Sequence, residues 1–117
     1  MQILAGLLAF PLWLVAAPHP AAAPDLEPGK RIYLKHCKVC HGIEGDGQSF
    51  AANVLNPPPK NFTSAESKKE LTLKRMIASA THGRPKTAMM PWKDNLSEEE
   101  IRAVVNYIRK ELMGITE

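Results

Sequence analysis

Apolar residues recur with a helical period in two stretches of this chain, and long polar loops separate these stretches. In the first, Leu73, Met76, Ile77 and Ala80 fall on one helical face, and Gly83 can end the helix. No stretch shows the strict alternation of apolar and polar residues that is typical of strands. The pattern therefore predicts an all-α fold.

The last helix is the most clearly marked element. Ser97 and Glu100 can form a capping box, in which each side chain bonds the backbone N–H of the other residue. Arg109 and Lys110 lie toward the negative end of the helix, and Gly114 can terminate it. The apolar face consists of Ile101, Val104, Val105, Ile108 and Leu112.

Two loops and an N-terminal helix complete the predicted elements. The N-terminal helix should open at Pro28, since proline suits the first helical turn, and run into the two cysteines of the chain. Residues 42–69 contain a triple proline and no sustained apolar period, so we expect a long loop there. The second loop passes through Pro85 and Pro91. Loops this long are uncommon in so small a domain unless something else holds them in place, and we expect a bound cofactor to do so.

The N-terminal segment differs from the rest of the chain. Residues 3–17 are nearly all apolar, but they are few for a bilayer span and are typical of a signal-peptide core, although no Lys or Arg precedes them. Small residues offer cleavage points at 15–17 and 21–23. We expect residues 1–23 to be a signal peptide or, alternatively, an N-terminal membrane anchor, followed by a tether at 24–28. The expected location is periplasmic or secreted, with membrane association only through this segment.

Length and charge limit the number of domains and the kinds of partner. The chain has 117 residues, enough for one domain at 29–117. Its 15 Lys and Arg against 12 Asp and Glu give a formal net charge of +3, with the two signs interspersed. Nucleic-acid binding requires a basic stripe, so nucleic acid is not an expected partner.

The candidate chemistry lies in a C-x-x-C-H motif formed by Cys37, Cys40 and His41. Two thiols at this spacing can each add to one vinyl group of a porphyrin, and the next imidazole can bind the iron, so the motif is the attachment signature of c-type haem. A zinc site would need further ligands at paired spacing, and a thioredoxin-like dithiol would need a strand-helix-strand setting. A plain disulfide would leave His41 without a role. The motif predicts one covalent haem c, with iron, as the cofactor.

A methionine is the expected second iron ligand. Residues 87–92 form the only loop that offers thioethers, those of Met89 and Met90, whereas Met76 lies on an apolar helical face and is expected in the core. A thioether favours ferrous iron and fills the coordination sphere, which suits electron transfer rather than substrate chemistry.

The whole domain resembles the bacterial class I cytochromes c. In that family a glycine, an aromatic residue and the first haem cysteine follow at intervals of four on the N-terminal helix, as Gly29, Tyr33 and Cys37 do here. Val104 and Tyr107 look like the residues of the last helix that pack across that glycine, although both tyrosines also fit as plain core aromatics. The resemblance implies three to five helices wrapped around one covalently bound haem, with the terminal helices crossing.

The resemblance also bears on the methionine ligand. The family's ligand loop commonly reads Thr-Ala-Met-Pro-x-Trp, and alignment on Trp92 and Leu96 puts its methionine on Met89. Alignment on the Met-Pro dipeptide selects Met90 instead. We favour Met89 because the capping box fixes the register of the following helix.

Other residues near the haem are implied less directly. By resemblance, a carbonyl among residues 57–59 would accept the second imidazole N–H of His41, although three prolines also fit a stiff surface connector. Suitable donors for the haem propionates are carried by Trp92, Lys60 and Arg84, and His36 and His82 are expected to be exposed or capping residues.

The expected function is one-electron shuttling between larger redox partner proteins, without enzyme activity of its own. One alternative is a haem enzyme or gas sensor with a displaceable methionine. Another is an electron-entry domain of a membrane oxidoreductase complex. A salt-sensitive docking face for an acidic partner is a further hypothesis, because lysines lie near the predicted haem. These lysines are Lys30, Lys35, Lys38, Lys86 and Lys93.

Overall fold

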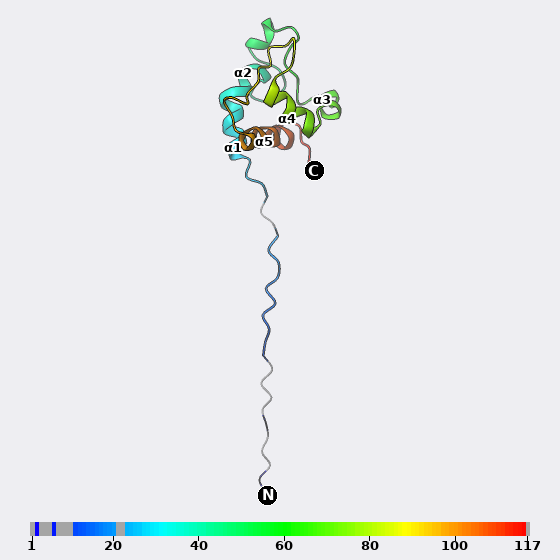
Figure 1. Cartoon of the computed structure of the whole chain (residues 1–117). Coiled ribbons are helices and arrows are strands. Elements are labelled where there is room, and N and C mark those ends of the chain that lie inside the picture. The colour runs from blue at the N-terminus through cyan, green and yellow to red at the C-terminus, as the bar shows by residue number, and fades with distance from the viewer. Residues whose placement is uncertain (1, 3–5, 7–10, 21–22, 117) are drawn as a thin grey trace.

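The computed structural model describes residues 2, 6, 11–20 and 23–116. Residues 11–20 are exposed and without regular structure, and they extend away from the helical domain (Figure 1). The rest of the predicted N-terminal segment, residues 1, 3–5, 7–10 and 21–22, lies outside the described residues. Among the described residues, no helix is long and apolar enough to cross a membrane.

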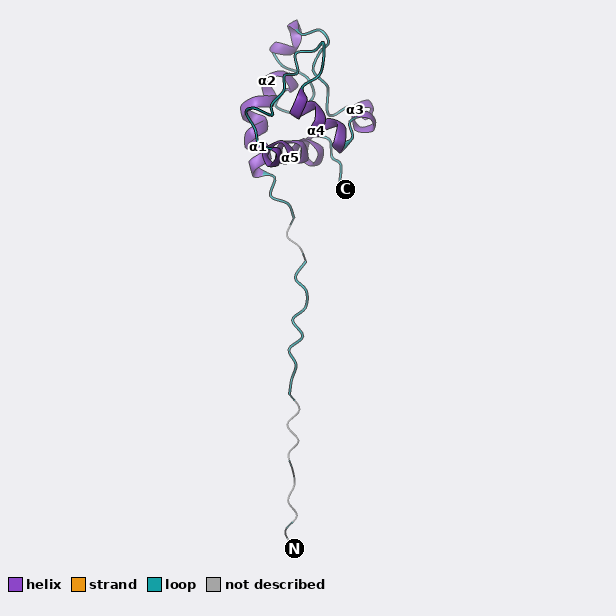
Figure 2. Ribbon diagram, in the orientation of Figure 1, coloured by secondary structure: helices purple, strands orange, loops and turns teal. Residues whose placement is uncertain are grey.

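All regular secondary structure in the described part of the chain is helical, with no strand, which confirms the all-α prediction (Figure 2). Loops of irregular structure occupy much of one side of the domain. The α-helices are α1 (Glu27–Ile32), α2 (Lys38–His41), α3 (Ala65–Glu70), α4 (Leu73–His82) and α5 (Glu98–Tyr107). The remaining elements are η1 (Tyr33–Cys37), η2 (Ala51–Val54) and η3 (Ile108–Leu112), of which η2 is a 3₁₀ turn and the other two are π-helical.

The N-terminal helix runs into the cysteines as predicted. The segments α1, η1 and α2 follow one another without a break from residue 27 to 41, and Gly42, at a φ of 84°, ends them. A positive φ is readily adopted only by glycine, so the chain can turn away directly after His41.

The two terminal helices cross at Gly29. A Cβ at this position would overlap the carbonyl oxygen of Ala103 and lie 2.9 Å from the Cβ of Tyr107, so only hydrogen fits. Beside the crossing, the rings of Tyr33 and Tyr107 pack with their centroids 5.5 Å apart, and both side chains are buried. The predicted crossing and the predicted core tyrosines are confirmed.

The core lies between α1, α4 and α5. Both helices predicted from apolar periodicity form where expected: Gly83 ends α4, and α5 begins with the Ser97–Glu100 capping box. Met76 is buried, as predicted. The core also contains Phe62, Leu71, Leu96, Ile101, Val104, Val105, Ile108 and Met113.

The prediction of a continuous loop over residues 42–69 was wrong in part, because α3 and η2 lie within or at the end of that stretch. Helix α3 begins at Ser64, whose hydroxyl accepts from the Ser67 N–H at 3.1 Å. Its only buried residue is Ser67, a polar one, so no apolar period marks the helix. Local capping, rather than an amphipathic pattern, defines it.

Arg109 lies in the last turn of the terminal helix, as expected, and it has a further role in the core. Its side chain is buried, and Nη1 donates to the carbonyl of Leu71 at 2.8 Å and contacts the sulfur of Met76 at 3.7 Å. The guanidinium therefore ties the last helix to the segment that joins α3 to α4.

Candidate functional site

A cavity of about 680 Å³ lies between the helical core and the loops. This volume is within the range of small-molecule and cofactor sites, about 300–1,000 Å³. One wall is made of core side chains, among them Leu71, Met76, Val104, Val105 and Ile108. Cys37, Cys40 and His41 line the cavity from η1 and α2, and Met89 and Met90 line it from the loop after α4. The structure therefore brings all five predicted site residues to one cavity.

Both cysteines are free thiols. Burial raises the pKa of the Cys37 thiol to about 12, and the nearby Cys40 adds to the effect, so Cys37 is protonated at neutral pH. Within the described part of the chain, no group of three or more His, Cys, Asp or Glu side chains could hold a metal ion.

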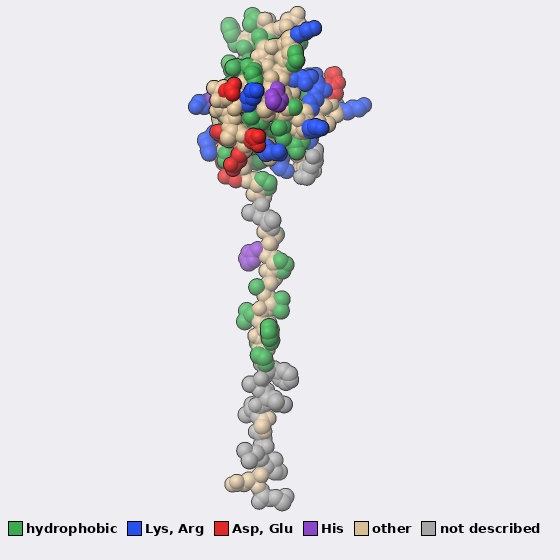
Figure 3. All heavy atoms as spheres, viewed as in Figure 1, with side chains coloured by type: hydrophobic (Ala, Val, Ile, Leu, Met, Phe, Trp, Pro, Cys, Tyr) green, Lys and Arg blue, Asp and Glu red, His purple; other side chains and the backbone are tan. Residues whose placement is uncertain are grey.

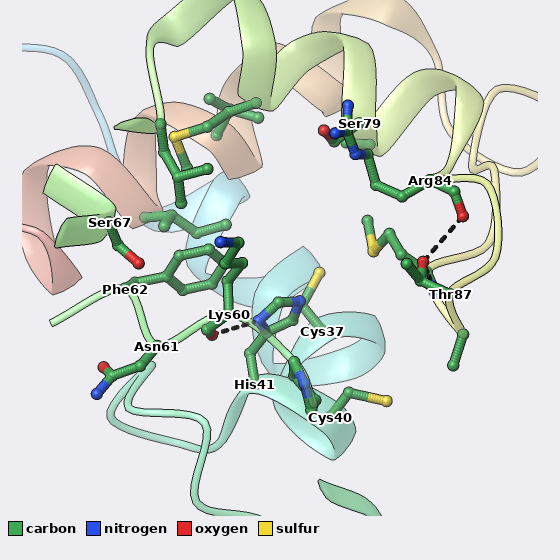
Figure 4. Close-up of a pocket in the computed structure, with 18 of the residues that line it drawn as sticks. Cys37, Cys40, His41, Lys60, Asn61, Phe62, Ser67, Ser79, Arg84 and Thr87 are labelled. Atoms are coloured by element: carbon green, nitrogen blue, oxygen red, sulfur yellow. Dashed lines mark hydrogen bonds between the residues drawn. The ribbon is translucent and has the colours of Figure 1, made fainter. Parts of the chain in front are cut away.

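His41 is held on two sides. Its Nδ1 lies 3.0 Å from the carbonyl oxygen of Lys60, and its ring stacks on Phe62 with the centroids 4.5 Å apart (Figure 4). Because a carbonyl can only accept, Nδ1 carries the proton and Nε2 keeps its lone pair. Burial lowers the pKa of His41, with the Lys60 hydrogen bond opposing this, so the neutral imidazole is favoured. A neutral imidazole with one fixed nitrogen and one open lone pair is suited to bind a metal.

The prediction of a carbonyl from residues 57–59 was wrong by one residue, since the acceptor is Lys60. The reason is that Phe62 is held at two points. Its N–H donates to the carbonyl oxygen of Gly45 at 2.7 Å, and its ring stacks on His41. Anchoring Phe62 fixes the carbonyl two residues before it, beyond the triple proline. The sequence signal for Phe62 was its place at the end of the proline-rich stretch that resembles the haem-flanking loop of cytochromes, and no role at the site was predicted for it.

Hydrogen bonds within the loop that follows α4 hold the methionine segment in place. The N–H of Arg84 donates to the Met89 carbonyl at 3.0 Å, and the N–H of Met89 donates to the Thr87 hydroxyl at 3.1 Å. Gly83, at a φ of 69°, lets this backbone come close, since a Cβ there would lie 2.6 Å from the Met89 carbonyl oxygen. Arg84 and Thr87 lie across the site from the helix of Cys37 and His41 in Figure 4. Met89 is half-buried, whereas Met90 is 53% exposed.

The other predicted haem neighbours differ in their surroundings. Lys60, Arg84 and Trp92 all line the cavity, and Lys60 Nζ also pairs with Glu70 at 3.5 Å. The expectation for His36 was wrong: its ring is half-buried against Trp92, with centroids 4.8 Å apart. His82 is exposed at the end of α4, as expected.

The residues and the cavity fit a covalently attached porphyrin. Two thiols and an imidazole with an open nitrogen line the same space as two thioethers, and most of the remaining wall is apolar. This is the donor set of a c-type haem with histidine and methionine available to the iron.

Comparison with known proteins agrees. The family model for cytochrome c matches residues 26–111, and the chain therefore belongs to the cytochrome c family. It is accordingly a small class I c-type cytochrome, which binds covalent haem c with its iron and takes part in haem-based electron transfer.

Individual relatives cover most of the domain. The chain is 33% identical over 106 residues to cytochrome c55X of Stutzerimonas stutzeri, covering 88% of this chain and 80% of that protein. It is 31% identical to cytochrome c6 of Cladophora glomerata, covering 71% and 85%. Among solved structures, the c-type cytochrome KustC0563 is similar with a TM-score of 0.60 and 33% identity, covering 69% of this chain and 93% of that one.

Proposed function

We propose that this protein is an exported mono-haem electron carrier in which Cys37 and Cys40 form the thioether bonds, His41 is one axial ligand and Met89 is the other. The observation that carries the proposal is the gathering of these four side chains around one apolar cavity. Haem iron, when bound, supplies the one-electron change between the ferric and ferrous states. The chain's own residues then serve to attach, orient and shield the cofactor.

The residues around His41 support its assignment. The Lys60 carbonyl holds the proton on Nδ1, and the stacked Phe62 ring restricts rotation, so Nε2 is the nitrogen left to bind the iron. A hydrogen bond from the other nitrogen of a ligand imidazole also makes it more basic.

Burial and hydrogen bonding support Met89 over Met90. Met89 is half-buried and its backbone is held on both sides, by Thr87 and by Arg84, whereas the side chain of Met90 is largely exposed. A neutral, soft thioether favours ferrous iron and raises the reduction potential.

Absorption spectroscopy of the purified oxidised protein tests the ligand assignment, with Met89→Ala and Met90→Ala as a matched pair. We expect Met89→Ala to lose the thioether-to-ferric charge-transfer band and to lower the reduction potential, and Met90→Ala to keep both. Loss of the band in Met90→Ala alone would overturn the choice of Met89. The pigment should stay with the protein in acidified organic solvent, and its release would contradict thioether attachment.

Carbon monoxide binding separates a carrier from a haem enzyme or gas sensor. We expect the ferrous protein not to bind carbon monoxide readily at neutral pH, because Met89 would occupy the sixth position. Ready binding would favour the enzyme or sensor instead.

A second candidate is an electron-transfer domain working within a larger complex. Partial matches favour it: the chain is 30% identical to the cytochrome c subunit of a quinone alcohol dehydrogenase of Gluconobacter oxydans, spanning 18% of that protein. Mass spectrometry of the exported protein distinguishes the two. A free periplasmic carrier should lack the residues before Pro24, whereas an anchored domain would retain them.

A further inference from the structure

Three hydrophobic side chains on the haem-binding side of the molecule are largely exposed. They form what we call the apolar patch: Val39 is 61% exposed, Phe50 93% and Val54 83%. Figure 3 shows hydrophobic side chains gathered at the end of the molecule where η2 lies, remote from the N-terminal segment. Soluble proteins rarely leave neighbouring large hydrophobic residues in water without a binding role.

The apolar patch is fixed to the C-x-x-C-H motif. Element η2 packs on α2, and the Ser49 hydroxyl donates to the Cys40 carbonyl at 2.8 Å while accepting from the Ala52 N–H at 3.0 Å. The Gly47 N–H donates to the His41 carbonyl at 2.8 Å. Phe50 and Val54 therefore project from a turn that is bonded directly to the haem-binding motif.

The apolar patch also borders the cavity. Val39, between the two cysteines, is exposed and lines the cavity at the same time, and Leu55 lines it directly after Val54. A protein seated on the patch would lie next to the edge of the site. Electron transfer needs this closeness.

The electrostatic character of this surface is neutral. Residues 47–59 contain no ionisable side chain. The nearest Lys, Arg, Asp and Glu side chains along the sequence are Lys38, Glu44, Asp46 and Lys60, two of each sign. A charged partner surface would gain little attraction here, and it would lose hydration on contact.

We propose that the apolar patch is the docking surface for a redox partner protein that presents an uncharged, apolar face. This inference rests on the proposed function as an electron carrier. Stable interfaces bury about 800 Å² and 20–30 residues per partner, so three side chains fit the small, short-lived interface of an electron-transfer encounter rather than a permanent dimer. Docking of this kind is nearly independent of salt, unlike docking through a lysine-rich face.

Electron self-exchange tests the proposal with a probe of known chemistry, because a second copy of this protein offers the same uncharged, apolar face. In a mixture of ferric and ferrous holoprotein, one electron passes from the ferrous copy to the ferric copy, and nuclear magnetic resonance line widths give the rate constant. We expect the double variant Phe50→Ser, Val54→Ser to exchange about tenfold more slowly, the change that corresponds to a loss of ~1.4 kcal/mol of association. The wild-type rate should change less than about twofold between low and physiological salt.

Controls separate docking from damage to the haem. Leu73→Ser, at a partly exposed hydrophobic residue on α4, should leave self-exchange unchanged. The absorption spectrum, the reduction potential and the rate of oxidation by the small anion ferricyanide should be the same in the double variant and the wild type.

The outcomes are distinct. An unchanged self-exchange rate in the double variant would overturn the docking proposal, and so would an equal loss in the ferricyanide reaction, which would place the effect at the haem. A wild-type rate that depends strongly on salt would favour the lysine face. Failure of the wild-type protein to bind haem or to exchange electrons would instead refute the proposed function.

Discussion

The helix crossing and the loop side of the cavity are built on different principles. At the crossing, Gly29 lies against the backbone of α5, and Tyr33 is fully buried, so the chain fills its own space. On the loop side, hydrogen bonds hold the His41 and Met89 segments around a cavity of about 680 Å³. The helix crossing needs no ligand to fill its space, whereas the loop side encloses a cavity that fits a cofactor. This small domain therefore depends on its cofactor to complete its core.

The largest effect should come from leaving the cavity without its haem. Without the haem, the apolar side chains that line the cavity would stay in contact with water, and a domain this small has little other burial to stabilise it. We expect the haem-free variant Cys37→Ser, Cys40→Ser to lack native helical circular dichroism. A cooperatively folded haem-free chain would show that the crossing alone supports the fold.

The next effect concerns the crossing itself. Gly29→Val would push a side chain into the Ala103 carbonyl and Tyr107, and we expect the free energy of unfolding of the holoprotein to fall by about 3 kcal/mol or more. Lys30→Val, which places the same residue at an exposed position of α1, should cost no more than ~0.7 kcal/mol. Denaturant titration measures both, and equal costs would mean that the close approach is unimportant.

On the loop side, Gly83→Ala tests whether a close backbone contact holds the methionine loop. The new methyl group would meet the Met89 carbonyl and Pro91, so we expect a loss of about 2 kcal/mol together with a weaker thioether-to-ferric band. Gly114→Ala is the matched control, since Gly114 also has a positive φ, 66°, but nothing lies within 4 Å of its added Cβ. If both variants behave alike, backbone strain alone explains the loss.

The smallest effect concerns the hydrogen bond that joins the two regions. The Tyr33 hydroxyl donates to the Gly42 carbonyl at 2.6 Å, directly after the haem-binding motif. We expect Tyr33→Phe to reduce the free energy of unfolding by about 1 kcal/mol, as for a typical buried hydrogen bond. Thermal unfolding of the holoprotein at neutral pH measures this loss, and no change would mean that water replaces the bond.

The same residue predicts a pH dependence. Burial raises the pKa of Tyr33 well above its usual value of about 10. Above pH ~10 the unfolded chain loses this proton while the folded protein keeps it, so stability falls as the pH rises. Tyr33→Phe should therefore show a shallower loss of stability above pH ~10 than the wild type. Parallel curves for the two proteins would contradict the assignment.

Sequence reasoning succeeded where the signal was local. Three features depend on residues only a few positions apart: the capping box at Ser97, the apolar period ending at Gly83 and the C-x-x-C-H spacing. Both helices form where they were predicted, and the motif residues line the cavity. The failures were the carbonyl that bonds His41, the packing of His36 on Trp92 and helix α3. All but the last depend on contacts between distant parts of the chain.

The N-terminal helix, α4, α5, the haem-binding motif and the family could be read from the amino-acid sequence alone, because helical periodicity, capping and thiol spacing are properties of short segments. The folded structure was needed to establish which carbonyl orients His41, how closely Met89 is held, and that the hydrophobic side chains of Val39, Phe50 and Val54 remain exposed. The physical reason is that burial and hydrogen-bond partners depend on which segments come into contact in the fold. Long loops allow many different contacts, so the sequence alone does not determine which ones form.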